Sequence, residues 1–225
     1  MLMQDASYSL SPRLELQSYL CDGLEGQKYG QLSDVQSKKP DQALFEEGDR
    51  ADHIYEVLRG MVRLSKMLPD GRRQVTGFLR AGQLFGLAPE GRHVFSAEAI
   101  GPVELRRYSR ANFDRLFDEI PGFARRVLSA TSHELRAAQD QMLLLGRKTA
   151  QEKLASFLLN LRIGKTVETP MSRADIADYL GLTVETVSRT VSKMKQDRLI
   201  TIVSMSQILI LQLDRLEELA AGECE

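Results

Sequence analysis

Cysteine is nearly absent from this sequence of 225 residues, which contains only Cys21 and Cys224, near its opposite ends. One chain therefore cannot supply the four thiolates of a zinc or iron-sulfur site, and so few cysteines are typical of a reducing compartment. The longest apolar run, at residues 199–205, is far shorter than the roughly 18 residues that a membrane helix needs. Asp5 precedes any Lys or Arg, and no apolar segment follows, so a secretory signal is not expected. The sequence predicts a cytoplasmic protein that does not span a membrane.

Motifs of the common enzyme classes are also missing. The chain has no P-loop, no G-x-S-x-G and no G-x-G-x-x-G. Its 3 histidines, His53, His93 and His133, share no metal-binding motif with one another, and we expect surface or hydrogen-bonded side chains there. The sequence thus predicts no catalytic site, no metal site and no bound cofactor.

A formal net charge of -1 hides an uneven distribution of charge. Lys and Arg outnumber Asp and Glu by ten to six between residues 147 and 213, whereas residues 214–225 carry five acidic side chains and one basic one. A basic module is a typical footprint of nucleic-acid binding, and a global mean can conceal it. We expect such a module, followed by an acidic and unstructured tail that contains Cys224.

The residue composition and the hydrophobic pattern change along the chain. Residues 42–110 are rich in glycine and in short β-rich runs, which break at Gly60 and turn at Asp70-Gly71, a hairpin signal. From Asn112 onward helical patterns dominate. We predict an α+β protein with an N-terminal extension (1–32), an antiparallel β-roll or jelly roll that resembles a sensor domain (33–120), a long dimerisation helix (121–146) and a C-terminal domain with the acidic tail (147–225).

Apolar and small residues recur in the long helix at alternating spacings of three and four, the a/d pattern of a coiled-coil seam. The positions are Leu128, Thr131, Leu135, Ala138, Met142 and Leu145. We expect them to form a homodimer interface. The alternative is that this stripe packs on the chain's own β-domain.

Residues 170–200 predict two short helices joined by a turn that contains glycine. Ser172 and Asp175 form the capping pattern of the first helix, Gly181 ends it, and Thr183 can cap the second. The side chains expected to face inward from the second helix are Val184, Val187, Val191 and Met194. This is the pattern of a helix-turn-helix, although an ordinary helical hairpin is the plainer alternative.

Segments on both sides complete a winged domain. Before the two helices, an amphipathic helix is predicted to start near residue 150 and to end at Gly164. After them, two β-branched runs around residues 204–207 predict a β-hairpin of the winged type.

The outer face of the second helix carries side chains suited to reading base edges. Glu185, Ser188 and Arg189 lie at i, i+3 and i+4 near its N-terminus. Arg can donate two hydrogen bonds to guanine, a carboxylate can accept one from cytosine, and a small polar side chain fits a thymine or adenine edge. The plainer interpretation of Glu185 and Arg189 is an exposed salt bridge. The candidates for phosphate contacts in the same region are Ser172, Arg173, Thr183, Thr186, Lys193 and Lys195.

These residues resemble the CRP/FNR family of bacterial transcription regulators, and SRADIADYLGLTVETVSR at 172–189 closely resembles its FixK-type branch. The resemblance extends from about Ser33 to Leu213. It implies a homodimer that binds a palindrome of TTGA-type half-sites in double-stranded DNA, with Arg189 on guanine, Glu185 on the complementary cytosine and Ser188 near a thymine. It also implies an activator that recruits RNA polymerase, at low-oxygen respiratory or nitrogen-fixation genes.

The departures from the family indicate how the protein is controlled. FNR-type oxygen sensors use three clustered N-terminal cysteines for an iron-sulfur cluster, and this chain has Cys21 alone there. In the segment that resembles the cyclic AMP cassette, Gly86 and Ser96 remain, but Leu87 and Phe95 replace the Glu and the Arg. A buried phosphate without its arginine is costly. We therefore expect no bound effector, and Phe95 as core filler.

Other interpretations remain open at this point. Within the same family, the chain could be a repressor or a regulator that responds to a cyclic nucleotide or another small ligand. From a different class, it could be a cupin-like metalloenzyme, against which the lack of an H-x-H pair in residues 42–110 counts. Arg72 and Arg73 follow the hairpin signal, where we expect a solvated hairpin end, with contact to RNA polymerase as the alternative.

Overall fold

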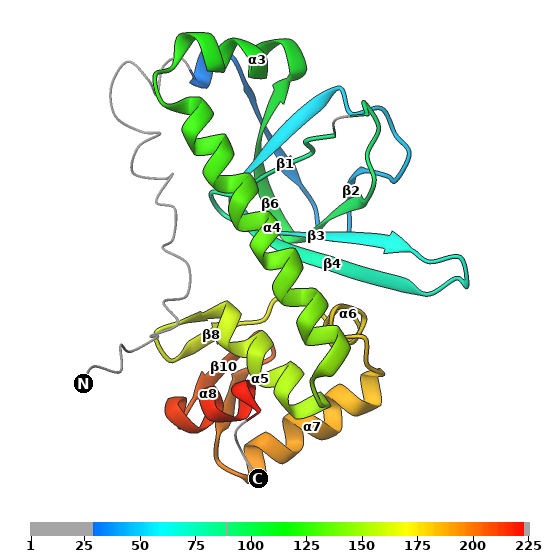
Figure 1. The fold of residues 1–225 in the computed structure, drawn as a ribbon, viewed down its shortest axis with the longest axis vertical. Coiled ribbons are helices and arrows are strands. Elements are labelled where there is room, and N and C mark those ends of the chain that lie inside the picture. The colour runs from blue at the N-terminus through cyan, green and yellow to red at the C-terminus, as the bar shows by residue number, and fades with distance from the viewer. Residues whose placement is uncertain (1–28, 89, 223–225) are drawn as a thin grey trace, which may run out of the picture.

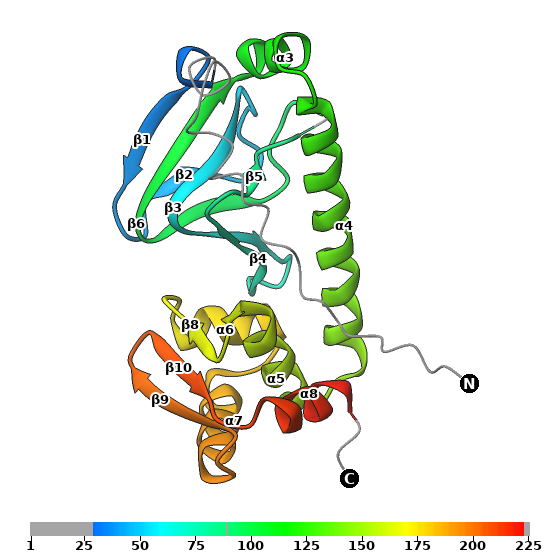
Figure 2. The same cartoon turned by 90° about the vertical axis from the view of Figure 1, so that its left-hand side faces the viewer.

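A computed structural model describes residues 29–88 and 90–222 of the chain. The chain forms an N-terminal β-domain and a C-terminal domain, and the helix α4 (Phe123–Arg147) runs along both of them (Figures 1 and 2). This arrangement confirms the predicted α+β class. Most of the expected N-terminal extension, including Cys21, lies outside the described residues, as do Cys224 and the side chain of His133.

The N-terminal domain is an antiparallel β-roll of six strands. Their order is β1-β6-β3-β4, with β2 paired to β6 and β5 paired to β3. Gly71, at φ 83°, turns the β3-β4 hairpin as predicted, and the backbone N–H of Leu68 donates to the carbonyl of Arg72 across it at 2.8 Å. The strands are β1 (Asp34–Lys38), β2 (Ala43–Phe45), β3 (His53–Met67), β4 (Arg73–Arg80), β5 (Leu84–Phe85) and β6 (Ser96–Ser109).

Strand β3 does not end at Gly60, where the sequence predicted a break. The strand continues, and its pairing with β6 shifts register between Arg59 and Met61. Gly60 has φ 87°, and a Cβ there would lie 2.4 Å from the carbonyl oxygen of Pro102. Only glycine fits this bend, because any side chain would collide with the neighbouring strand.

Helix α3 (Arg110–Glu119) anchors the start of α4 on the β-roll. Ser109 caps α3 by accepting a hydrogen bond from the backbone N–H of Asn112 at 3.2 Å. Phe113 is buried and packs edge-on against Tyr108 and Phe123, at ring-centroid distances of 5.8 and 5.3 Å. These aromatic contacts fix the direction in which α4 leaves the β-domain.

The C-terminal domain combines four helices and four strands into a winged helix-turn-helix. A small antiparallel sheet of order β7-β8-β10-β9 packs beside its helices. The elements are α5 (Ala150–Leu161), β7 (Arg162–Ile163), β8 (Thr166–Glu168), α6 (Arg173–Leu180), α7 (Val184–Gln196), β9 (Ile200–Ser204), β10 (Gln207–Ile210) and α8 (Leu213–Ala221).

Two boundaries in this domain correct the sequence prediction. Helix α5 ends at Leu161 rather than at Gly164, because the next two residues pair with β8 and Gly164 forms the turn between them at φ 61°. The acidic tail is folded over residues 213–221 as α8, which packs against α5. Leu216 and Ala220 on its inner face are buried, so apolar packing overrides the negative charge of this segment.

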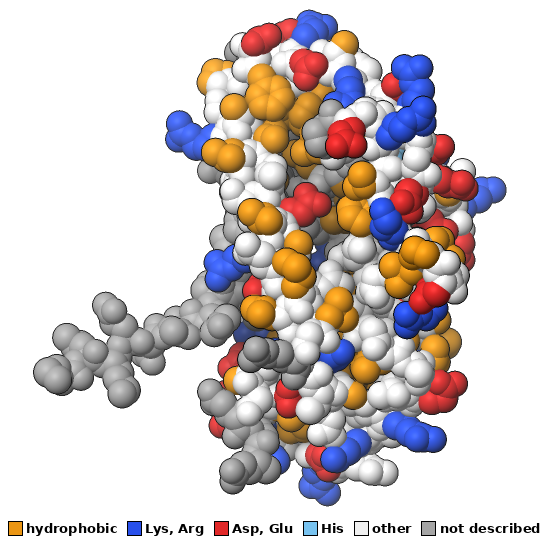
Figure 3. All heavy atoms as spheres, turned by 45° about the vertical axis from the view of Figure 1, so that its right-hand side comes forward, with side chains coloured by type: hydrophobic (Ala, Val, Ile, Leu, Met, Phe, Trp, Pro, Cys, Tyr) orange, Lys and Arg blue, Asp and Glu red, His pale blue; other side chains and the backbone are white. Residues whose placement is uncertain are grey.

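The apolar stripe of α4 is exposed rather than packed on the chain's own β-domain. The side chains of Leu128, Leu135 and Met142 are 68%, 61% and 66% exposed, and Thr131 and Ala138 are exposed as well. Figure 3 shows hydrophobic side chains spaced along this helix on the molecular surface.

Leu145, the last position predicted for the stripe, belongs elsewhere. It is half-buried and packs against the core of the C-terminal domain, where its Cδ2 atom would lie 3.2 Å from a Cβ at Gly181. The last turn of α4 is therefore covered by the chain's own helix-turn-helix, which removes Leu145 from the exposed seam. Among the described residues, no helix is long and apolar enough to cross a membrane.

His93 lies in the interior of the β-roll, whereas His53 is only half-buried. The His93 ring stacks on Phe45 with centroids 3.5 Å apart and an interplanar angle of 9°. Burial lowers the pKa of His93 from its ordinary value, and the positive charge of nearby Arg110 acts in the same direction. The folded protein therefore holds this imidazole in its neutral form near neutral pH.

We expect the free energy of unfolding to decrease as the pH falls below about 6.5, the ordinary pKa of histidine. Between that pH and the lower pKa of folded His93, the histidine of the unfolded chain takes up a proton while the buried imidazole stays neutral. This group therefore changes the free energy of unfolding by at most about 1.4 kcal/mol per pH unit. Urea unfolding of the parent and of His93→Phe at several pH values between 5.5 and 7.5 measures it. The variant should lose this part of the slope, with His53→Phe as the matched control; equal slopes for the parent and His93→Phe would contradict the assignment.

Candidate nucleic-acid interface

The two helices of the helix-turn-helix begin and end where the sequence predicted. Ser172 caps α6, and its hydroxyl accepts from the backbone N–H of Asp175 at 3.1 Å. Gly181 ends α6 in the left-handed region at φ 62°, and the Thr183 hydroxyl accepts from the backbone N–H of Thr186 at 3.2 Å to cap α7. The turn between the helices is thus determined by residues adjacent in sequence.

The inner face of α7 is buried at three of the four expected positions. Val187, Val191 and Met194 are buried against the core, but Val184 is 41% exposed. Val184 is the first residue of α7, one turn before Val187, and lies beyond the edge of the core formed with α5 and α6. The exposed side chain adds an apolar contact to the outer face, which sequence analysis missed.

The outer face of α7 presents the three predicted base-reading side chains together. Glu185, Ser188 and Arg189 are all exposed. Hydrogen bonds from its own backbone N–H and from the Thr183 hydroxyl hold the pKa of Glu185 below its ordinary value, and Arg189 lowers it further. The carboxylate is therefore ionised and acts as an acceptor. Among the described residues, the ion pairs do not include one between Glu185 and Arg189, and both side chains are exposed.

The predicted phosphate contacts fall into two groups. Thr183, Thr186, Lys193 and Lys195 lie on α7, and both lysines are exposed in its last turn. Arg173, at the start of α6, is half-buried, and burial lowers its pKa.

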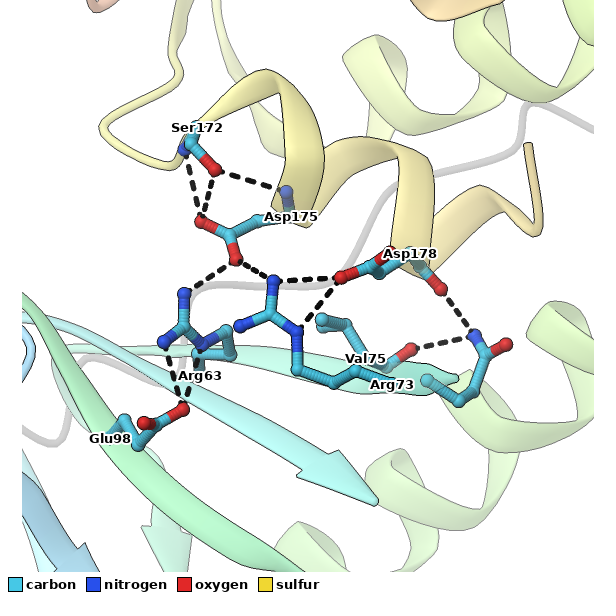
Figure 4. Close-up of polar contacts among 8 residues, drawn as sticks. Arg63, Arg73, Val75, Glu98, Ser172, Asp175 and Asp178 are labelled. Atoms are coloured by element: carbon cyan, nitrogen blue, oxygen red, sulfur yellow. Dashed lines mark hydrogen bonds and ion pairs between the residues drawn. The ribbon is translucent and has the colours of Figure 1, made fainter. Parts of the chain in front are cut away.

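Ser172, another candidate for a phosphate contact, is exposed at the start of α6. Its hydroxyl accepts from the Asp175 backbone and donates to the Asp175 carboxylate at 2.8 Å (Figure 4). This side chain also lines a cleft between the domains, together with Arg63 and Arg73. Both the donor and an acceptor position of this hydroxyl are therefore already used by Asp175.

Two lysines support the helix-turn-helix from behind. Lys153 on α5 is 8% exposed, and its Nζ donates to the carbonyl of Leu180 at the end of α6 at 3.2 Å. Lys148 donates to the carbonyl of Ala220 at the end of α8 at 2.7 Å. Cations at helix C-termini satisfy the free carbonyls and offset the negative end of the helix dipole. Sequence analysis counted these lysines only as positive charge.

The β3-β4 hairpin meets α6 through ion pairs, which corrects the expectation of a solvated hairpin end at Arg73. Its Nε donates to Asp178 and its Nη2 to Asp175, both at 2.8 Å (Figure 4). Arg63 of β3 donates to the same carboxylate of Asp175, and at 2.8 Å to Glu98 of β6. Arg72 keeps the expected position: its side chain is 78% exposed, and its one ion pair within the described part of the chain joins it to Asp70 on its own turn.

Burial opposes ionisation in this group, but the hydrogen bonds and charges of the partners outweigh it. Burial alone would raise the pKa of Asp175, but hydrogen bonds from Ser172 and the charges of Arg63 and Arg73 outweigh it, so the pKa lies below its ordinary value. Burial alone would lower the pKa of Arg63, but its bond to Glu98 and the charge of Asp175 raise it overall. Both groups are therefore charged in the folded protein.

Between the β-roll and α4, a small cavity of about 80 Å³ lies next to the segment that contains Leu87 and Phe95. Phe95 is half-buried at its edge rather than part of the domain core, which corrects the prediction of core filler. Lys66 lies over its ring at 6.0 Å from the centroid. The described residues that line the cavity include no arginine or lysine. Elsewhere in the described chain, no three His, Cys, Asp or Glu side chains form a possible metal site.

Two family models match this chain. The Crp-like helix-turn-helix domain matches residues 152–219, and the cyclic nucleotide-binding domain matches residues 35–119. The chain is 45% identical over 191 residues to the transcriptional activatory protein AadR of Rhodopseudomonas palustris, covering 81% of this chain and 80% of that protein. It is 46% identical over 189 residues to the nitrogen fixation regulation protein FixK of Bradyrhizobium diazoefficiens, covering 80% and 79%.

Among solved structures, FixK2 from Bradyrhizobium japonicum is similar at a TM-score of 0.78 and 38% identity, with 83% of this chain and 96% of that chain covered. The chain therefore belongs to the CRP/FNR family of transcription regulators, where it is most like FixK-type members.

A cyclic nucleotide does not fit the β-roll of this family member. Its cavity of about 80 Å³ is well below the roughly 300 Å³ of small ligand pockets. Phe95 stands where the phosphate would need an arginine, and Leu87, 41% exposed, cannot accept hydrogen bonds from a ribose. The fold is shared with the cyclic nucleotide-binding domain, but the chemistry is not.

Proposed function

We propose that this protein is a cytoplasmic transcription activator, not an enzyme, that binds a palindrome of TTGA-type half-sites as a homodimer without an effector. The observation that carries the proposal is the exposed stripe of Glu185, Ser188 and Arg189 on α7. In this scheme residues 33–120 form a sensor-like β-roll, residues 121–146 the dimerisation helix and residues 147–225 the DNA-binding domain. Similarity to FixK and AadR supports low-oxygen respiratory or nitrogen-fixation genes as targets, with RNA polymerase as the recruited partner.

The chemistry of the α7 face matches a TTGA half-site. Arg189 has a free fork for guanine O6 and N7, and ionised Glu185 is an acceptor for N4 of the paired cytosine. Ser188 and the exposed apolar side chain of Val184 lie one turn apart on the same side of the helix, where they suit thymine edges and methyl groups. Thr183, Thr186, Lys193, Lys195 and Arg173 supply the phosphate contacts that position the helix.

Arg189→Ala is expected to weaken operator binding by about 1 to 3 kcal/mol per half-site and to relax the preference for guanine, because a bidentate contact is lost. Lys193→Ala is the matched control. It removes the same charge four residues further along the same helix, and should weaken binding to all sequences alike and reduce the salt dependence.

The measurement is equilibrium binding of the parent and both variants to operators that carry each base at the TTGA guanine. If Arg189→Ala prefers guanine as strongly as the parent does, Arg189 is not the guanine reader. A parent protein that binds random and TTGA-containing duplexes equally would contradict the proposed function itself.

The exposed stripe on α4 supports a two-fold dimer. Leu128, Leu135 and Met142 are apolar side chains more than half exposed along one side of a long helix, together with Thr131 and Ala138. A second copy of α4 would bury them in a coiled-coil seam. A two-fold axis along this seam directs two α7 helices into successive major grooves, roughly 10 base pairs apart, which is why the site should be a palindrome.

Leu135→Asp should convert the dimer to monomer and lower operator affinity about tenfold or more, because two like charges would face each other in the seam and the two half-sites would no longer be bound together. Ala137→Asp adds the same charge about 200° around the helix, also at an exposed position, and should leave the dimer intact. Sedimentation velocity and operator binding measure both variants. A dimer that survives Leu135→Asp would exclude this stripe as the interface.

The proposal also predicts DNA binding without additives. Protein purified in air should bind its operator, and cyclic AMP should change the affinity less than tenfold, since the cavity next to Phe95 offers no partner for a phosphate. Binding titrations with and without cyclic AMP, together with iron analysis, check this. A gain above about tenfold, or 1.4 kcal/mol, would assign an effector to the β-roll.

A further inference from the structure

Ion pairs between the β-roll and the first helix of the helix-turn-helix form a continuous group. We call the five side chains Arg63, Arg73, Glu98, Asp175 and Asp178 the interdomain network. Its centre is shielded from water: the side chains of Arg63 and Asp175 are 9% and 5% exposed. Its rim is accessible, with Arg73 and Asp178 at 28% and 30%. Asp175 receives both arginines, one from each strand of the hairpin.

Apolar and amide contacts surround the network. Phe78 of β4 packs against Tyr179 of α6 and Phe157 of α5, with ring centroids 5.3 and 6.1 Å apart. Gln74 of β4 donates to the carbonyl of Asp178. Gln141 of α4 donates to the carbonyl of Tyr179 at 3.4 Å, so the long helix joins the same contact. The hairpin, α4 and α6 thus meet at one junction.

The chemistry of this junction allows it to open without unfolding either domain. A cleft of about 440 Å³, which Arg63, Arg73 and Asp175 help to line, lies beside the network. When the domains separate, water can solvate all five charges, so no uncompensated charge remains buried. The apolar part of the junction, Phe78 against Tyr179 and Phe157, is exposed at the same time and favours the closed state. The network therefore fixes an orientation while remaining reversible.

The junction leaves the DNA-reading surface free. Helix α6 lies between β4 and α7, and α7 lies at the end of the molecule away from the β-roll (Figures 1 and 2). Glu185, Ser188 and Arg189 are exposed while the network is formed. The closed junction is therefore compatible with an α7 that enters a major groove.

We propose that the interdomain network is a latch that holds the DNA-binding domain in its DNA-competent orientation, the task that a bound effector would otherwise perform. The proposal rests on the proposed DNA-binding function. A latch raises the fraction of molecules whose two α7 helices match the operator, and apparent affinity scales with that fraction. The base contacts themselves do not change, so the latch governs affinity and leaves sequence preference unaltered.

Arg73→Gln tests the latch, with Arg72→Gln as the matched control. Both changes remove one positive charge from the same hairpin, but Arg72 has its only ion pair within the turn. In the full-length protein, Arg73→Gln should raise the operator dissociation constant about tenfold, keep the parent's base preference, and speed hydrogen-deuterium exchange in residues 73–80 and 173–180. Arg72→Gln should match the parent in all three measurements.

Asp178→Lys provides a second variant from the other side of the junction, where a like charge would face Arg73, and its effect should equal or exceed that of Arg73→Gln. Parent-like affinity and exchange in both variants would overturn the latch. So would faster exchange with unchanged affinity, which would make the junction mere packing, or tighter binding, which would make it a restraint on DNA binding.

Failure of the proposed function is a separate result. If the parent does not prefer TTGA-type palindromes, the same comparison is made on the sequences that the parent selects from random duplex DNA. The ratio of affinities between variant and parent on those sequences still decides whether the latch exists.

Discussion

The carboxylate of Asp175 is the interaction on which the arrangement of the protein depends. One of its oxygens completes the capping box of α6 with Ser172, and the other receives Arg63 and Arg73 from the β-roll. A single side chain therefore starts the helix-turn-helix and attaches it to the rest of the molecule. Since its charge is almost fully buried, it is stable only while these partners surround it. The local cap of α6 and the orientation of the DNA-binding domain relative to the β-roll are thereby coupled.

This coupling gives a physical basis for regulation without a ligand. In a protein that binds an effector, the free energy of effector binding can select one orientation of the DNA-binding domain. In this β-roll the corresponding cavity is small, and the phosphate-binding arginine is replaced by Phe95. Under the two proposals, selection by ion pairs built into the chain takes the place of an effector, and control would act on the amount of protein or on a partner. That is consistent with the absence of an effector in the proposed function.

Helix α7 has an inner face that packs in the core and an outer face that is exposed. The inner side chains Val187, Val191 and Met194 fill the core and hold the helix rigidly, which keeps the outer side chains in fixed relative positions. Val184 lies outside this core at the helix start and extends the reading face by one apolar contact. Lys153, buried behind α6, sets the turn that aims α7. Under the proposed function, specificity would depend on these buried side chains as well as on the exposed ones that meet DNA.

The sequence by itself determined the features that rest on neighbouring residues. Capping by Ser172 and Thr183, termination at Gly181, the Asp70-Gly71 hairpin and the stripe on α4 all follow from local periodicity and turn chemistry. The common exposed face of Glu185, Ser188 and Arg189 follows from helical spacing. Only the tertiary structure decided the pairing of Arg73 with α6, the burial of Leu145 and the folding of the acidic tail as α8. These depend on residues about 100 positions apart or on a second apolar surface, and no pattern along the chain records which distant partner a charge or a leucine will meet.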